Sequence, residues 1–267
     1  MLAGIAECAA VFERNDFLEV AVKNAEFVLS QMTYRDSENH LRLYRTWRNG
    51  QGKGNGFLED YACYAEGLLW LYEATADSRW LDASDSLLQT MLALFWDEQE
   101  GGFFFTSSDH ESLIQRPKDW DDNAVPSGNS VAMDLLTRMA ILRGKPEYQE
   151  KALRLLRTLA PNLQKYPYGF ARVLSVLEFC LSSPLEIVIL GAPNEPATQA
   201  LRRVAYESYH PNRVLVFAED AETAPQGIPL LEQRGQINGK PTAYLCTNFT
   251  CQEPTTDPNT LRKQLQA

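Results

Sequence analysis

One helical pattern occurs three times in this sequence, and this repetition restricts the fold more than any other feature. Each copy has an Ala/Leu-rich helix, a short polar turn, an aromatic residue and a second helix, with apolar residues at three- and four-residue spacing. The aromatic residues are Phe17, Trp80 and Tyr148, and each is followed four positions later by a small residue. Positions i and i+4 share a helix face, so the small residue leaves room for the ring. Stacked hairpins of this kind predict a helical solenoid or a closed ring.

Two long segments, residues 40–56 and 97–126, separate the three hairpins. The stretches RLYRTW and GGFFFT within them predict short strands. Loops of this length inside a domain are usually functional or disordered, and their content of aromatic residues, Arg and Asp favours ordered segments. If the hairpins stack in parallel, both segments emerge on one rim, and each ends where the first helix of a hairpin begins.

The predicted rim is rich in acids, amides and aromatic residues, which suits recognition of a polyhydroxylated ligand. The candidate catalytic residues are Glu59, Asp60, Asp121 and Asp122, because two carboxyl groups can flank a glycosidic bond as acid and base. The candidate substrate-binding residues are Tyr61, Trp47, Arg116, Lys118, Trp120 and Asn129.

A purely structural interpretation of the same residues stays open. Acids at a helix start complement the helix dipole. The acids at 119, 121 and 122 can instead form salt bridges with Arg116 and Lys118 that anchor the long segment, and Ser127 is a good N-cap for the following helix.

The sequence changes character near Ser182. LEIVILG and RVLVFAE are typical of buried strands, and a helix is expected between them at about residues 195–208. A third strand, TAYLC, and a short last helix follow. This order predicts a small parallel α/β unit, with domains at 1–182 and 183–267.

Composition narrows the possible partners and the compartment. The net charge of −10 disfavours nucleic acid and anionic membranes as partners. No apolar stretch approaches the roughly 18 residues that span a bilayer, and the N-terminus does not resemble a signal peptide. The five scattered cysteines predict reduced thiols rather than a disulfide framework. We therefore expect a soluble, cytoplasmic protein.

No cofactor and no metal are predicted from the motifs. A dinucleotide fingerprint, a P-loop and a nucleophile elbow are all missing from the sequence. The pair Cys246 and Cys251 is interpreted as structural, with metal binding or redox cycling as the alternatives. None of the three histidines, His40, His110 and His210, lies inside the stretches 56–62, 95–104, 116–130 or 238–258, which disfavours a mechanism based on paired histidines.

Four longer motifs carry a family resemblance: GFLEDYA (56–62), FWDEQEGGFF (95–104), RPKDWDDNAVPSGNS (116–130) and NGKPTAYLCTNFTCQEPTTDP (238–258). Together they resemble the YyaL-like family, the spermatogenesis-associated thioredoxin-domain proteins. The resemblance implies a thioredoxin-like domain, then an α/α ring similar to N-acylglucosamine 2-epimerases and six-hairpin glycosidases, then a small tail. The sequence starts inside the ring and has no C-x-x-C motif, so we expect only the C-terminal part of this organisation.

The expected fold is therefore mainly α: an incomplete α/α toroid of helical hairpins, six-hairpin glycosidase-like, with a small C-terminal α/β domain. The expected function is that of a carbohydrate-related protein that binds a small sugar or acts on it with the rim carboxylates. The alternatives are a non-catalytic scaffold half, completed by a protein partner or a second copy of the chain, and a truncated inactive homologue.

Overall fold

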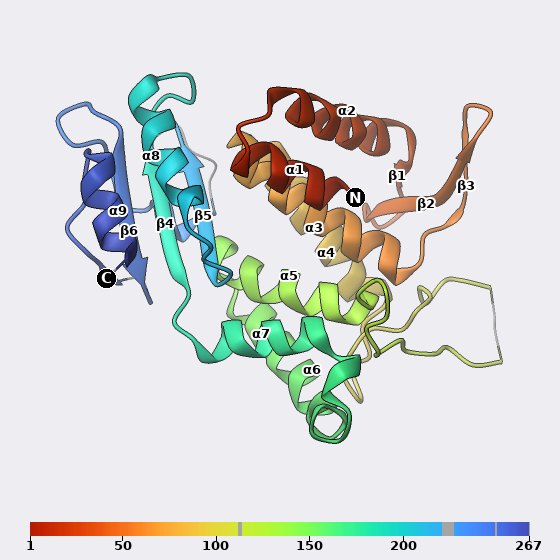
Figure 1. The fold of residues 1–267 in the computed structure, drawn as a ribbon. Helices are drawn as coiled ribbons and strands as arrows, with labels where there is room; N and C mark the ends of the chain where they lie inside the picture. The colour runs from red at the N-terminus through yellow and green to blue at the C-terminus, as the bar shows by residue number, and fades with distance from the viewer. Residues whose placement is uncertain (112–113, 221–226, 249, 267) are drawn as a thin grey trace.

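The computed structural model describes residues 1–111, 114–220, 227–248 and 250–266, and this part of the chain is mainly helical (Figure 1). Residues 112–113, which belong to the second long segment discussed above, lie outside the described residues. The helices before residue 182 are α1 (Leu2–Val11), α2 (Asn15–Gln31), α3 (Leu58–Thr75), α4 (Ser78–Leu94), α5 (Gly128–Arg143), α6 (Pro146–Lys165) and α7 (Ala171–Leu181), with the short 3-10 helix η1 (Pro167–Gly169) before α7.

The three predicted hairpins are α1–α2, α3–α4 and α5–α6. The aromatic residues Phe17, Trp80 and Tyr148 each occupy the third position of the second helix. The small residue one turn later is fully buried in all three copies. This equivalence confirms that one unit is repeated three times.

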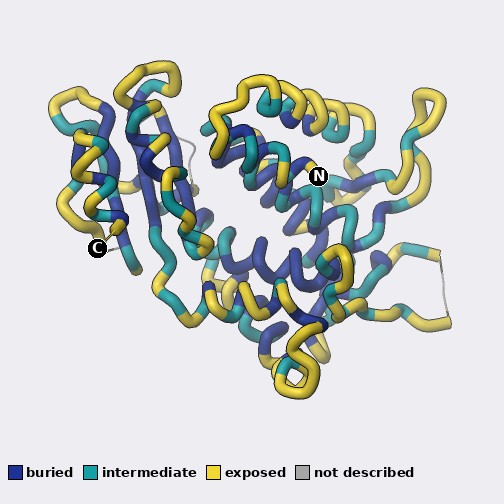
Figure 2. Tube along the Cα trace, viewed as in Figure 1, coloured by how far each residue is buried: buried dark blue, intermediate teal, exposed yellow. Residues whose placement is uncertain are grey.

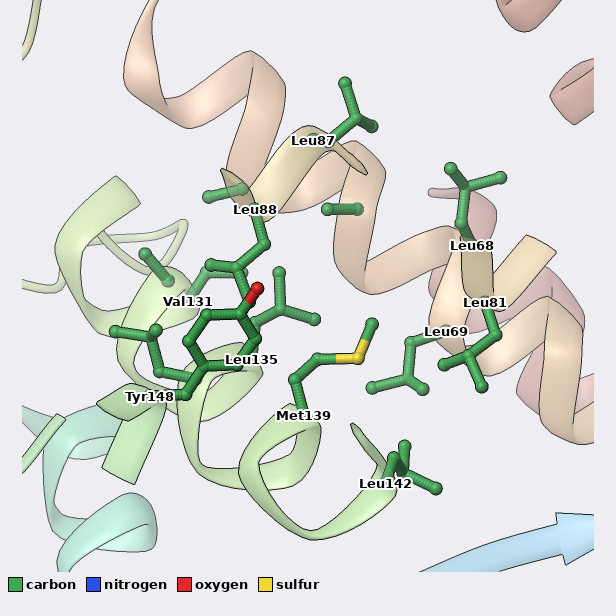
Figure 3. Packing of buried hydrophobic residues seen from close by; sticks show 14 of the residues in the cluster. Leu68, Leu69, Leu81, Leu87, Leu88, Val131, Leu135, Met139, Leu142 and Tyr148 are labelled. Carbon is green, nitrogen blue, oxygen red and sulfur yellow. The ribbon is translucent and has the colours of Figure 1, made fainter. Parts of the chain in front are cut away.

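The helices pack in two layers. Contacts join α1 to α3, α3 to α5 and α5 to α7, which makes one layer, and α2, α4 and α6 each pack on the first helix of their own hairpin. Figure 3 shows apolar side chains of α3, α4, α5 and α6 meeting between the layers, among them Leu69, Leu88, Leu135 and Tyr148. The layer made by α1, α3, α5 and α7 is called the inner layer below.

The first long segment forms an antiparallel sheet of β1 (Thr33–Arg35), β2 (Leu41–Arg48) and β3 (Gln51–Asn55). The prediction of a strand at RLYRTW is confirmed. The strand predicted at GGFFFT is wrong, because only one bridge, between Trp96 and Phe103, forms there. Gly102 turns the chain with φ of +80°, and the ring of Trp120 lies 2.3 Å from where a Cβ would stand, which prevents an extended ladder.

The two long segments lie together on one rim, as predicted. Arg42 of β2 donates to both carboxylate oxygens of Asp109, at 2.8 and 3.0 Å. The rings of Phe57 and Phe105 stack with centroids 4.7 Å apart. The acids that these segments carry are thereby brought to the same end of the inner layer.

The last part of the chain contains β4 (Leu185–Leu190), α8 (Pro196–Glu207), β5 (Arg213–Ala218), the 3-10 helix η2 (Pro229–Leu231), β6 (Thr242–Thr247), β7 (Thr250–Cys251) and α9 (Pro258–Gln266), with strand order β5-β4-β6-β7. Strands β4 and β5 are parallel, as predicted, but β6 runs antiparallel to β4. The prediction of an all-parallel unit is therefore wrong. Strand β6 begins at the end of the sheet where β5 ends, so an antiparallel β6 needs no crossover to the other end.

This sheet is buried on both faces. Alternate residues such as Ile187 and Leu215 pack with α8 and α9, whereas Val188 and Val216 point the other way and join the core of the helical layers. Figure 2 shows β4 and β5 as buried along most of their length. One face of the sheet thus shares the apolar core of the helical layers, and the other face forms a second core with α8 and α9.

The cysteines differ from the prediction at one place. Cys246 and Cys251 are cross-strand partners on β6 and β7, and they form a disulfide. Direct pairing across two strands brings the sulfur atoms together without moving the backbone, so the prediction of reduced thiols is wrong for this pair. Cys8, Cys63 and Cys180 are free and half-buried. Among the described residues, no helix combines the length and apolar character needed to cross a membrane.

Candidate functional site

The predicted acids of α3 lie at its first turn. Asp60 accepts a hydrogen bond from the backbone N–H of Phe57 at 2.8 Å, which caps the helix. Arg45 of β2 donates to Glu59 at 2.9 Å and to Asp60 at 2.5 Å. Both acids therefore already have partners, and Asp60 has a structural role as a cap in addition to any role toward a ligand.

The acids of the second long segment gather next to those of α3. Burial raises the pKa of Asp119, and Asp121, Glu59 and Asp122 raise it further by repulsion. Asp122 accepts from the backbone N–H of Ser127 at 3.0 Å and of Arg172 at 2.7 Å. It thereby ties the starts of α5 and α7 together, whereas Asp121 is exposed. These four acids and Asp60 are called the acidic rim below.

Two of the predicted substrate-binding residues belong to the core. Tyr61 is fully buried, and its hydroxyl accepts from the backbone N–H of Leu43 at 2.9 Å and from Arg42 at 3.3 Å. Asn129 is also fully buried, and its amide exchanges two hydrogen bonds with the backbone of Phe103. The expectation that these side chains face a ligand at the rim is corrected: each holds a neighbouring segment in place.

The predicted cations anchor the long segment. Arg116 donates to the carbonyl oxygens of Leu94 and Thr106, at 3.3 and 2.6 Å. Lys118 donates to Asp97 at 2.6 Å, and this bond lowers the pKa of Asp97 to about 2. The structure therefore supports the anchoring interpretation for both cations.

The two predicted tryptophans lie apart. Trp120 is half-buried beneath Gly102 and packs against the helical core. Trp47 is half-buried on β2 and meets Phe27 edge-to-face, with centroids 5.7 Å apart. The structure does not bring them together as one stacking platform.

A second polar region lies deeper along the same helices. A cavity of about 560 Å³ opens between the inner layer and the segment that leads into β5. It is called the inner cleft below. Its lining is mostly polar or charged and includes Glu7, Trp70, Asp134, Arg138, Arg172, Glu178, His210 and Asn212.

A network of buried and half-buried charges, of which Asp134, Arg138 and Arg172 line the cavity, forms one wall of the inner cleft. Arg172 of α7 donates to Asp134 of α5 at 2.6 Å and also to Glu66 of α3. Arg138 donates to Asp134 at 3.1 Å and to the backbone oxygen of Arg213 at 2.8 Å. The network therefore connects three helices of the inner layer with the start of β5.

The two carboxyl groups of this network differ in proton affinity. Burial raises the pKa of Glu66, and the attraction of Arg172 does not compensate for it. Burial also acts to raise the pKa of Asp134, but Arg138 and Arg172 together bring it below its ordinary value. Neighbouring carboxyl groups with separated pKa values are the arrangement that acid–base chemistry requires. Within the described ranges, no group of three or more His, Cys, Asp or Glu residues is placed to hold a metal ion.

Sequence reasoning missed the inner cleft, although a signal exists. Glu59, Glu66, Trp70 and Glu73 follow one another along one face of α3, in a helix whose other faces are apolar. On α5, Asp134 and Arg138 likewise lie one turn apart on one face of the helix. A polar stripe on a helix that is otherwise buried indicates an internal polar surface.

The fold and the site define a class: stacked helical hairpins with an acidic rim, a polar inner cleft and a terminal α/β unit. The chain is 33% identical to human spermatogenesis-associated protein 20 over 273 residues, and 32% identical to the mouse protein over 276 residues. Each alignment covers 99% of this chain and 35% of the relative. An uncharacterized protein of Caenorhabditis elegans is 24% identical over 260 residues, which cover 95% of this chain. No family model matches.

These matches confirm the family resemblance drawn from the motifs. The chain is similar to spermatogenesis-associated protein 20 along nearly its whole length, and it spans about a third of the length of the curated relatives it matches.

Proposed function

We propose that this chain is the sugar-binding part of a carbohydrate-related protein with an incomplete α/α toroid, and that the sugar occupies the inner cleft. The observation that carries the proposal is the composition of this cleft. Trp70, the Asp134 carboxylate and the Arg138 and Arg172 guanidinium groups converge on one cavity of about 560 Å³. A pyranose ring needs an apolar surface for its C–H face together with both donors and acceptors for its hydroxyl groups.

Asp134, which lines the cleft, and Glu66, which lies behind the lining and bonds to Arg172, supply the chemistry for a step beyond binding. The raised pKa of Glu66 suits a proton donor, and the lowered pKa of Asp134 suits a base or an anionic stabiliser. The acidic rim forms an outer subsite in this proposal, because Glu59 lies two turns before Glu66 on the same face of α3. Glu59 and Asp121 would then contact the part of a longer ligand that leaves the cleft.

Calorimetric titration with glucose, mannose, N-acetylglucosamine and maltose tests the binding site. We expect Trp70→Leu to weaken binding of the preferred sugar at least about tenfold, through loss of the ring face. Glu59→Gln and Asp121→Asn are the matched rim variants, and they should change affinity for the monosaccharides less than about twofold. Affinity that is lost in the rim variants and kept in Trp70→Leu would place the site at the rim instead. No binding by any of the four sugars would refute the proposal.

A second candidate function is a non-catalytic scaffold, and an apolar surface on the first hairpin favours it. Val20 and Phe27, seven positions apart on α2, are 53% and 41% exposed, and Phe12 in the preceding turn is 66% exposed. A second copy or a protein partner would cover this surface and extend the row of hairpins. Light scattering tests the homodimer: we expect a dimer that Val20→Asp converts to a monomer. A monomer at every concentration would leave a different protein as the only partner that fits.

A further inference from the structure

The disulfide between Cys246 and Cys251 is markedly asymmetric. Cys246, on β6, is 1% exposed, whereas Cys251, on the short edge strand β7, is exposed. An external thiol can therefore approach the sulfur of Cys251 but not that of Cys246. Attack at Cys251 would release Cys246 as the leaving group.

A guanidinium group lies against both sulfur atoms. Arg234 Nη2 is 3.1 Å from Cys251 Sγ and 3.4 Å from Cys246 Sγ. The same side chain donates to the backbone oxygen of Leu230, which fixes its direction. A neutral disulfide gains little from a cation, but a thiolate in the same place is strongly stabilised by one.

The segment that carries Arg234 is fastened to the strand that carries Cys246. The hydroxyl of Tyr244, on β6, donates to the backbone oxygen of Gly235 at 2.6 Å and accepts from its N–H at 3.1 Å. Glu186 is a charged residue near the pair, opposite Cys246 in the register of β4 and β6. The bonds between Tyr244 and Gly235 thus hold the neighbouring Arg234 close to the two sulfur atoms.

We propose that Cys246 and Cys251 form a thiol–disulfide exchange site, in which Arg234 stabilises the thiolate that leaves on Cys246. The site is separate from the inner cleft, and it does not depend on sugar binding. Its substrate is a dithiol or, in the reverse direction, a disulfide. Arg234 is a positioning residue: it stabilises the negative charge of the leaving thiolate and does not itself react.

The exchange balances in two steps. A thiolate of the dithiol attacks Cys251 Sγ, the Cys246–Cys251 bond breaks, and its electron pair stays on Cys246 Sγ beside Arg234. The second thiolate of the same dithiol then attacks the sulfur atom of its own mixed disulfide and releases Cys251. The substrate loses two electrons and two protons and becomes a disulfide, while both cysteines become thiols.

The rate of reduction by dithiothreitol tests the role of Arg234. Samples of the oxidised full chain are quenched with acid, alkylated and weighed by mass spectrometry. We expect Arg234→Met to slow reduction about tenfold at pH 7, and to move alkylation of the reduced pair to higher pH, because the leaving thiolate loses its cation. Arg234→Lys should restore most of the rate. Arg262→Met removes a different surface arginine and should leave the rate unchanged.

Two cysteine variants test the direction of attack and do not depend on the arginine. With glutathione disulfide, Cys246→Ser should accumulate a mixed disulfide on the exposed Cys251, at least about tenfold faster than Cys251→Ser reacts through the buried Cys246. Equal rates for wild type, Arg234→Met and Arg262→Met, or equal labelling of the two cysteine variants, would overturn the proposal and leave a structural staple.

Discussion

The acidic rim and the inner cleft place carboxylates on the same helices but in different surroundings. On α3, Glu59 at the rim has a side chain that is 45% exposed, whereas Glu66, two turns deeper, is 16% exposed. Of the rim acids, Asp60 and Asp122 accept from backbone N–H groups, and Glu59 and Asp60 pair with Arg45 on a strand. The two carboxyl groups at the cleft share Arg172, and Asp134 also bonds to Arg138.

This difference shows that the position of a charged side chain along a helix determines how much its ion pair contributes to the stability of the fold. Exposed ion pairs contribute little, because water and salt screen them. Removal of one partner from a buried pair leaves an uncompensated charge and is strongly destabilising. We therefore expect the cleft to be intolerant of changes that the rim accepts.

The largest effect is expected from Arg172→Met. This change leaves Glu66 without its guanidinium partner and Asp134 with Arg138 alone, and it should lower the free energy of unfolding by about 2–4 kcal/mol. Urea unfolding at pH 7 measures it. The double variant Glu66→Gln, Arg172→Met should recover part of the loss. A loss below about 1 kcal/mol would show that water in the cleft already compensates these carboxylates.

Glu73 lies two turns after Glu66 on α3, and its side chain is buried. Burial raises its pKa to about 7, despite attraction from Arg138 and Arg213. Folding therefore favours the protonated form: this stability is fully present below the unfolded pKa of about 4.5, and it is lost as pH rises through about 7. Glu73→Gln should raise the free energy of unfolding at pH 8 by up to about 3 kcal/mol and have no effect near pH 4. A gain that is equal at both pH values would contradict this assignment.

The sequence predicts the elements that depend on local pattern. The three hairpins follow from the aromatic residue and the small residue that recur in each copy, and β2 follows from its alternating pattern. The meeting of the two long segments on one rim follows from parallel stacking alone. These features need only the chain's own periodicity and the direction of successive helices.

The rest depends on contacts between distant segments. The strand expected at GGFFFT is prevented by Trp120, which follows it by some fifteen residues and fills the space over Gly102. The inner cleft requires Arg172 to reach residues of two other helices, and no local pattern records that meeting. The roles of Tyr61 and Asn129 as internal clamps likewise appear only when their buried backbone partners are in place.

Two neighbouring rim acids, Asp121 and Asp122, differ in their structural role. Asp122 bonds the backbone N–H groups at the starts of α5 and α7, whereas Asp121 is exposed. Asp122→Asn loses the charged acceptor and one of the two bonds, so it should cost about 1–2 kcal/mol of unfolding free energy. Asp121→Asn is the matched control and should stay within about 0.5 kcal/mol. Equal losses would mean that charge alone, rather than capping, sets the stability of the rim.

The smallest effect is expected where an arginine is removed from the rim. Arg45 contacts Glu59 and Asp60 as Arg172 contacts its two carboxylates, but Glu59 and Asp60 are 45% and 27% exposed, against 16% and 7% for the two carboxylates of Arg172. Arg45→Met should therefore lower the free energy of unfolding by less than about 1 kcal/mol, and 0.5 M sodium chloride should remove most of that difference. The salt series matters more than the absolute value, because screening acts on exposed pairs and spares buried ones. A loss at Arg45 that equals the loss at Arg172 and persists in salt would mean that the rim is as closed to water as the cleft, and the contrast between the two regions would fail.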